Sequence, residues 1–153
     1  MSQPQVVKIP KPINKKVLYT VEKIVKFLLV HNKSFSVSFD NNSSIEDEED
    51  IKKIEGNSIS VSIDNPVEYG DIADFIEKLG FVAVNGVENK IAQYIGFEQS
   101  LFQEEWEKTI YEKEKGDRSK EVRIIVVVKG VTTNGKSTVD FVMAYPKILV
   151  WKK

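Results

Sequence analysis

Residues 123–143 have the sequence RIIVVVKGVTTNGKSTVDFVM. Two runs of β-branched and other apolar residues flank the dipeptide Asn134-Gly135, which favours a tight type I′ turn between two paired strands. Folding the chain at this dipeptide places Lys129 opposite Asp140, so that the two charges pair. The stretch therefore predicts a β-hairpin over residues 121–150.

The same stretch matches the pattern of a phosphate-binding P-loop, and it resembles the Thr-Asn-Gly-Lys-Thr loop of Mur-type ligases. In that interpretation Gly130 and Gly135 belong to the loop, Lys136 reaches the outer phosphates and Ser137 holds magnesium. A P-loop must be followed by a helix and by further strands, whereas the residues after Ser137 are β-branched and aromatic and are typical of a strand. We therefore interpret the motif as a hairpin turn and expect no cofactor.

Two further segments predict a second hairpin. Residues 34–41 (SFSVSFDN) and 58–65 (SISVSIDN) alternate strictly between apolar and polar positions, which is typical of half-buried strands that pair. The connector 41–56 contains five consecutive acidic residues, 46–50, and like charges at this density favour a mobile, exposed loop.

Four helices are expected from the remaining patterns. The apolar residues between positions 14 and 32 recur every three or four residues, which predicts a helix that ends near His31. Asn65-Pro66 supplies a capping side chain and a proline at the first helical position, and Gly80 supplies the stop. A third helix is predicted from near Val87 to Gly96. A fourth is predicted from Phe97 to about Gly116, on the four- and five-residue spacing of its apolar side chains.

These elements predict an α+β fold in which four amphipathic helices pack with an antiparallel sheet of about four strands, built from two β-hairpins. We expect an extended basic arm over residues 1–13 and a single domain over 14–153. The helical parts of that domain are 14–32 and 66–116, and its β parts are 33–64 and 121–150.

Composition excludes several classes of chemistry. The chain of 153 residues has no cysteine and one histidine, so disulfides, thiolate catalysis and zinc fingers are excluded. His31 follows an apolar helix, and a histidine at the C-terminus of a helix interacts favourably with the helix dipole. We therefore interpret His31 as a structural residue rather than a catalytic one. An EF-hand over 40–51 fails because Ile45 and Ile51 occupy the positions of its glycine and glutamate. We therefore expect no metal site and no enzymatic activity.

Charge divides unevenly along the chain. Residues 1–33 carry a net charge of +6, residues 34–80 carry −9, and residues 121–153 carry +4. The basic residues are 20 lysines and only two arginines, which favours contact with a phosphate backbone over the reading of bases. The same composition also arises in chains from hot habitats.

The predicted function is that of a non-catalytic subunit of a nucleoprotein complex, which contacts nucleic-acid backbone, DNA or RNA, and partner proteins. The start of the chain lacks the apolar core of a secretory signal, and no apolar run reaches the length of a membrane span. We therefore expect a cytoplasmic protein without a membrane partner. The residues expected to bind nucleic acid are Lys8, Lys11, Lys15, Lys16, Lys147, Lys152 and Lys153.

Two segments, 69–76 (YGDIADFI) and 87–94 (VENKIAQY), look like the paired helices of the small subunit of archaeal type I-A CRISPR interference complexes. The basic residue expected after the aspartate of the first segment is replaced here by Ile72. This resemblance implies a role in RNA-guided antiviral defence, with contacts to the backbone rather than to bases.

Two alternatives from other classes stay open at this stage. The first is a structural or regulatory protein of viral or mobile-element origin that associates with itself, since the predicted 121–150 hairpin is apolar on both faces and needs cover on each. The second is a small metal-dependent nuclease, because Asp71, Asp74 and Glu77 lie at helical spacing.

Overall fold

The computed structural model describes residues 14–43, 55–84, 93–96, 99–113 and 119–151. Its elements, in chain order, are α1 (Lys15–Val30), β1 (Phe35–Ser43), β2 (Glu55–Glu68), α2 (Tyr69–Lys78), β3 (Val82–Ala83), β4 (Gln93–Gly96), β5 (Gln99–Lys113), β6 (Ser119–Thr133) and β7 (Lys136–Trp151). Within these residues all strands form one antiparallel sheet in the order β1-β2-β7-β6-β5-β3, and β4 pairs with β5 outside this path.

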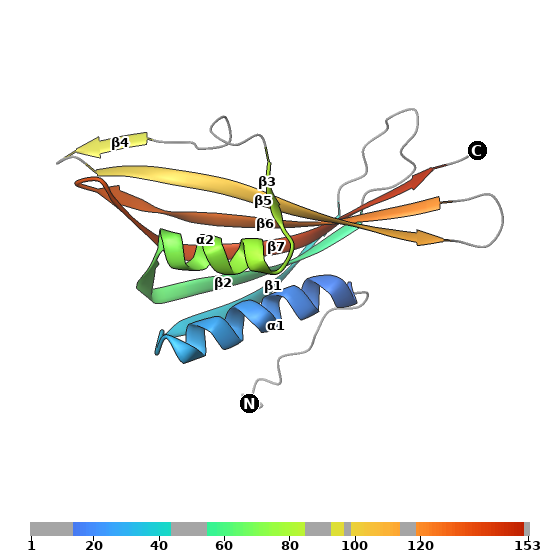
Figure 1. Ribbon diagram of the computed structural model, residues 1–153, viewed down its shortest axis with the longest axis horizontal. Coiled ribbons are helices and arrows are strands. Elements are labelled where there is room, and N and C mark those ends of the chain that lie inside the picture. The colour runs from blue at the N-terminus through green and yellow to red at the C-terminus, as the bar shows by residue number, and fades with distance from the viewer. Residues whose placement is uncertain (1–13, 44–54, 85–92, 97–98, 114–118, 152–153) are drawn as a thin grey trace, which may run out of the picture.

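Both helices lie on the same side of the sheet (Figure 1) and share one core with it. Alternate residues of β6, namely Val122, Ile124, Val126 and Val128, are buried in this core. Side chains alternate between the two faces of a strand, so these residues lie on the helix side of the sheet, while β2 and β7 contact the helices themselves. The apolar residues that α1 and α2 bury against the sheet are Val17, Val21, Ile24, Leu28, Ile72, Ala73 and Ile76.

The hairpin between β6 and β7 has the predicted turn. Asn134 and Gly135 form a two-residue loop between Thr133 and Lys136, and both have positive φ angles, 51° and 80°. Positive φ at both central residues is the type I′ geometry, whose twist matches that of the flanking strands.

The predicted register of this hairpin holds only near the turn. Gly130 lies opposite Val139, but a bulge follows and Lys129 then lies opposite Phe141 instead of Asp140. Asp140 is therefore the extra residue of the bulge, and the Lys129 ammonium lies 5.2 Å from the centre of the Phe141 ring. The predicted charge pair is wrong because a bulge, which inserts one residue on one strand only, shifts the pairing beyond it by one.

The first two strands pair as predicted. Phe35 lies opposite Ile63 and Val37 lies opposite Val61, and the register is continuous over the whole of β1. The apolar residues of both strands face α1, and Ile59, Val61 and Ile63 are buried.

The predicted four helices with a four-stranded sheet are wrong, because the described chain is mostly sheet and has two helices. The segment predicted as the fourth helix is β5, which pairs with β6 over its whole length. Its residues Phe102, Trp106 and Ile110 recur at intervals of four, which places them on one face of a strand as well as on one face of a helix. Of the predicted third helix, residues 93–96 form β4 and residues 87–92 lie outside the described part of the chain.

The predicted start of the second helix is also displaced. Asn65 and Pro66 belong to β2, where the pairing with β7 is interrupted between Ser62 and Val67. The helix begins at Tyr69, and its N-cap residue Glu68 makes no capping hydrogen bond with its side chain. Proline has no N–H to donate, so it is tolerated where the pairing of a strand is interrupted. The missing N–H also makes proline common at the first position of a helix, which is why the sequence predicts a helix start here.

The first helix is confirmed. Its N-cap is Asn14, whose side-chain oxygen accepts hydrogen bonds from the backbone N–H groups of Lys16, at 2.8 Å, and Val17. Its C-cap is His31, and the ring Nδ1 of this residue lies 2.8 Å from the Phe27 carbonyl oxygen. A histidine that interacts with the last turn of a helix has a structural role there.

We expect opposite effects from alanine at two glycines. A Cβ at Gly130 would lie 1.9 Å from the Thr138 carbonyl oxygen and 2.9 Å from the Phe102 ring, so Gly130→Ala should lower the free energy of unfolding by about 1–3 kcal/mol. A Cβ at Gly70 in α2 would meet nothing within 4 Å, so Gly70→Ala should raise it by about 0.4–1 kcal/mol. Urea unfolding followed by circular dichroism measures both, and equal stability of the two variants would contradict this account.

Candidate functional site: the exposed faces of α1

The helix α1 presents two exposed surfaces besides its buried side. One, which we name the basic face, carries Lys15, Lys16, Lys23 and Lys26. The other lies toward the edge strand β1 and is apolar. Both follow from the helical period, because residues three or four positions apart share a side of the helix.

The basic face concentrates positive charge. Its four lysines are accompanied in α1 by one acidic residue, Glu22, and three of them (Lys15, Lys16 and Lys26) are exposed. Tyr19 lies among them with 57% of its surface exposed, and the Lys23 ammonium lies 5.0 Å from the centre of its ring. Within the described part of the chain, no ion pair neutralises these ammonium groups.

Three described lysines outside α1 contact neighbouring polar groups. Lys33 donates to the Pro66 carbonyl at 3.1 Å, and Lys108 donates to the Leu79 carbonyl at 2.9 Å at the end of α2. Lys136, the lysine of the apparent P-loop, lies 3.3 Å from a carboxylate oxygen of Glu68. The other described helix, α2, contains one lysine, so α1 is the described helix with the most positive charge.

The structure does not place all of the lysines predicted to bind nucleic acid on one surface. Lys15 and Lys16 form the first turn of α1 and are exposed. Lys147 is half-buried on β7 opposite Arg123, and strand alternation places it on the face opposite to Ala144, which packs beneath the helices. Lys147 therefore does not join the basic face. The others, Lys8, Lys11, Lys152 and Lys153, lie outside the described residues.

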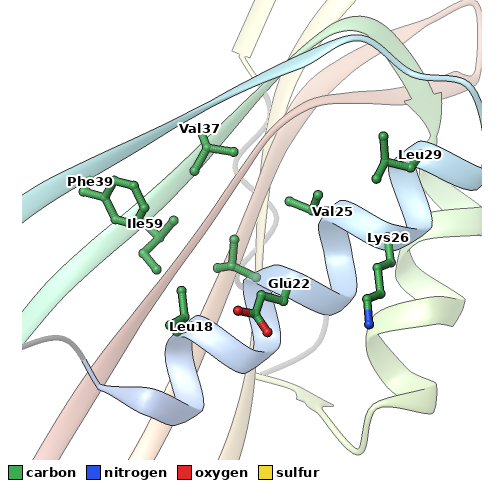
Figure 2. A pocket seen from close by; sticks show the side chains of 9 residues that line it. Leu18, Glu22, Val25, Lys26, Leu29, Val37, Phe39 and Ile59 are labelled. Carbon is green, nitrogen blue, oxygen red and sulfur yellow. The ribbon is translucent and has the colours of Figure 1, made fainter. Parts of the chain in front are cut away.

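An apolar groove of about 370 Å³ runs between α1 and the edge of the sheet. Figure 2 shows Leu18, Val25 and Leu29 of α1 directed toward the strands that carry Val37, Phe39 and Ile59. Val37 and Leu29 retain 37% and 59% of their exposed surface. Glu22 and Lys26 line the outer rim of the groove.

Sequence reasoning missed this groove. Val25 and Leu29 belong to the same periodic pattern as the buried residues of α1, so the pattern assigns them to the core. The apolar stripe of α1 extends beyond the side that packs on the sheet, since Leu29 stays 59% exposed, and the sequence has no signal that marks where the packed part of the stripe ends.

A polar cluster lies between α2 and β5. The Tyr69 hydroxyl donates to the Glu104 carboxylate, and its ring meets Phe102 edge to face with 5.7 Å between the ring centres. Burial, together with the negative charge of Glu104, raises the pKa of Tyr69 above its ordinary value of 10.0. Burial, and secondarily Glu105, raises the pKa of Tyr145.

The described residues offer no assembled metal centre. Asp71, Asp74 and Glu77 are all exposed on α2, and within the described ranges no three metal-ligating side chains lie close enough to hold an ion. In the hairpin, the Ser137 hydroxyl lies 2.7 Å from the Thr132 hydroxyl across the turn. The nuclease alternative and the P-loop interpretation therefore gain no support from the geometry.

No protein-family model, curated protein or solved structure matches this chain. Neither described helix is long and apolar enough to cross a membrane. The pair of helices on which the CRISPR small-subunit resemblance depends is not formed by the described residues. The first segment begins α2, but Gln93 and Tyr94 of the second belong to the strand β4.

We expect Tyr69 to make stability depend on pH in the alkaline range. Because its folded pKa lies above the unfolded value of 10.0, the native state holds this proton more tightly. The stabilisation is complete below pH 10 and is lost as the pH rises above 10. The tyrosinate absorbance of Tyr69 is the difference between the parent protein and Tyr69→Phe. It should therefore appear above pH 10 in the native protein and near pH 10 in urea. The same midpoint in both states would contradict this expectation.

Trp106 gives a prediction about packing. The side chain is 1% exposed, and within the described residues its indole N–H has no hydrogen-bond partner. Trp106→Ala should cost about 3–5 kcal/mol of unfolding free energy, because it leaves a cavity beneath α2. Trp106→Phe should cost much less, because it keeps an aromatic ring and removes an unpaired buried donor. Urea titration followed by circular dichroism compares the stability of the two variants, and an equal loss would contradict this account.

Proposed function

We propose that this protein is a non-catalytic subunit of a nucleoprotein complex and contacts the nucleic-acid backbone through the basic face of α1. The observation that carries the proposal is the set of four lysines on one helix, without ion-pair partners among the described residues. A cluster of lysines on one helix is the electrostatic footprint expected for binding to phosphates.

The chemistry of the face suits the backbone better than the bases. An ammonium group is a point charge without the planar fork that a guanidinium uses to read guanine, and α1 contains no arginine. From Lys15 to Lys26 the helix rises about 16 Å, which is several times the roughly 3.4 Å axial rise per nucleotide of one DNA strand. The face is therefore long enough to meet several phosphates at once.

An exposed aromatic ring adds to this surface. Tyr19 lies beside Lys23 and is available for stacking against an unpaired base. Stacking between bases and aromatic side chains tolerates any sequence, and combined with lysines it favours single-stranded nucleic acid. Lys8 and Lys11 precede α1 in the sequence and add positive charge before its first turn.

The test is fluorescence anisotropy with a labelled single strand of DNA, its RNA equivalent and a duplex, each over a series of salt concentrations. We expect the Lys16→Glu/Lys23→Glu double variant to bind about tenfold or more weakly to every sequence. The slope of log affinity against log salt should become less steep by about 1.4 on the single strand, at about 0.7 for each of the two lost phosphate contacts. Both lysines lie away from the apolar groove.

A matched control makes the same change of charge elsewhere. Lys129→Glu/Lys136→Glu alters two exposed lysines of the β6–β7 hairpin and should leave affinity and slope close to those of the parent protein. This control variant also tests the P-loop interpretation. If Lys136 belonged to a nucleotide site, the control variant would lose the saturable ATP binding of the parent protein. Equal affinity of the parent and the α1 variant would discard the electrostatic proposal.

The partner proteins need a separate experiment. Gentle affinity purification from the native host, with and without nuclease, should recover protein partners together with bound nucleic acid. Components of an RNA-guided interference complex among them would support the defence role that the resemblance implies. Recovery of the chain alone in both halves would contradict a role in a nucleoprotein complex.

A further inference from the structure

The two helices carry opposite charge and lie side by side. Figure 1 shows α1 and α2 next to each other on one side of the sheet, and the rings of Phe27 and Phe75 stack between them with 4.7 Å between their centres. The helix axes are therefore on the order of 10 Å apart, as in other packed helix pairs. The α1 helix contains four lysines and one acidic residue, whereas α2 contains three acidic residues and one lysine.

The solvent side of α2, which we name the acidic strip, carries Asp71, Asp74 and Glu77. All three are exposed, and their spacing of three residues places them on successive turns of the helix. None of these carboxylates forms an ion pair within the part of the chain that the structure describes. Lys78 in the last turn of α2 offsets only part of this charge.

The basic face and the acidic strip meet where the two helices touch. Lys23 lies one turn before Phe27 on α1, so it is on the side of α1 that faces α2. Asp71 lies one turn before Phe75 on α2, so it is on the side of α2 that faces α1. The electrostatic potential therefore changes sign across a single helix spacing.

We propose that the acidic strip of α2 restricts the basic face of α1 to single-stranded nucleic acid, because its carboxylates repel the second strand of a duplex. The inference rests on the proposed function, since it names the kind of nucleic acid that the basic face accepts. The carboxylates of the strip bind nothing in this account. They set specificity by rejecting one ligand, which leaves the contacts to the other ligand unchanged.

The dimensions of a duplex bring its second strand over the acidic strip. The two backbones of B-form DNA border grooves that are about 6 Å and about 12 Å wide. These widths are of the same order as the roughly 10 Å between the axes of packed helices. When one strand follows the lysines of α1 and the other lies on the side of α2, the phosphates of the second strand therefore meet exposed carboxylates.

The other side of α1 offers the second strand no compensation. There the helix borders the apolar groove, and Glu22 adds a negative charge at the rim. Phosphates on this side would lie over Leu29 and Val37, which are exposed and apolar. Charged groups lose hydration over such a surface without gaining a partner. A single strand occupies α1 alone and avoids both penalties.

The test compares a labelled single strand of DNA with its duplex by fluorescence anisotropy at low salt. We expect the parent protein to prefer the single strand by about tenfold or more. Asp74→Asn/Glu77→Gln should reduce this preference about threefold or more, mainly through tighter binding of the duplex. The reduction should shrink as salt is added, because above about 0.1 M the screening length falls below the ~10 Å between the helices.

A second variant and a matched control accompany this test. Asp74→Lys/Glu77→Lys reverses the two charges and should reduce the preference further. Glu105→Gln/Glu107→Gln removes the same amount of charge from the other face of the sheet, because these residues flank the buried Trp106 on β5. This control should keep the preference of the parent. Asp71 is left in place because a negative charge in the first turn stabilises α2.

Two results would overturn the inference: equal affinity of the parent for single strand and duplex, or the same preference in the α2 variants and in the control. Both results leave the proposed function standing as long as Lys16→Glu/Lys23→Glu weakens binding of the single strand. Failure of the parent to bind either form would overturn the proposed function and this inference together, so the two failures are distinguishable.

Discussion

The structure depends on the pairing of β6 with a neighbour on each side. β6 bonds to β5 across fifteen residue pairs, from Ser119 to Thr133, and to β7 over the same range apart from one bulge. Its alternate residues Val122, Ile124, Val126 and Val128 belong to the shared core, and its partner β7, with β2 beside it, contacts both helices. Since hydrophobic burial is the main stabilising term, the location of α1 and α2 and of the surfaces they expose follows from where this central ladder places β7 and β2.

Local signals in the sequence account for the parts of the fold that were predicted correctly. Asn134-Gly135 specifies its turn through two residues that tolerate positive φ, and the alternating serines of β1 and β2 specify half-buried strands. Asn14 caps α1 with its own side chain. Each of these features is decided by a few neighbouring residues, so a single sequence reveals it.

The parts predicted wrongly are decided by distant residues. The spacing of Phe102, Trp106 and Ile110 fits a helix and a strand equally, and only the adjacent β6 selects the strand. For the candidate site, Lys15 and Lys16 were predicted from charge alone. The placement of Lys147 on the face of the sheet away from the helices could not be predicted, because it depends on which residues of β7 point inward. The groove beside α1 could not be predicted, because the sequence does not state how far the sheet extends beneath the helix.

The single extra residue at Asp140 has a consequence for how this chain can change in evolution. Gly130 lies opposite Val139 and Lys129 lies opposite Phe141, so Asp140 is the one residue between them without a partner of its own on β6. Loss of Asp140 would leave these pairs unchanged and would remove only the bulge, so Val142 and Ala144 would still face inward. A change of one residue in the length of β7 among descendants of this sequence should therefore be found at this point more often than elsewhere in the strand, where it would turn the later side chains to the other face.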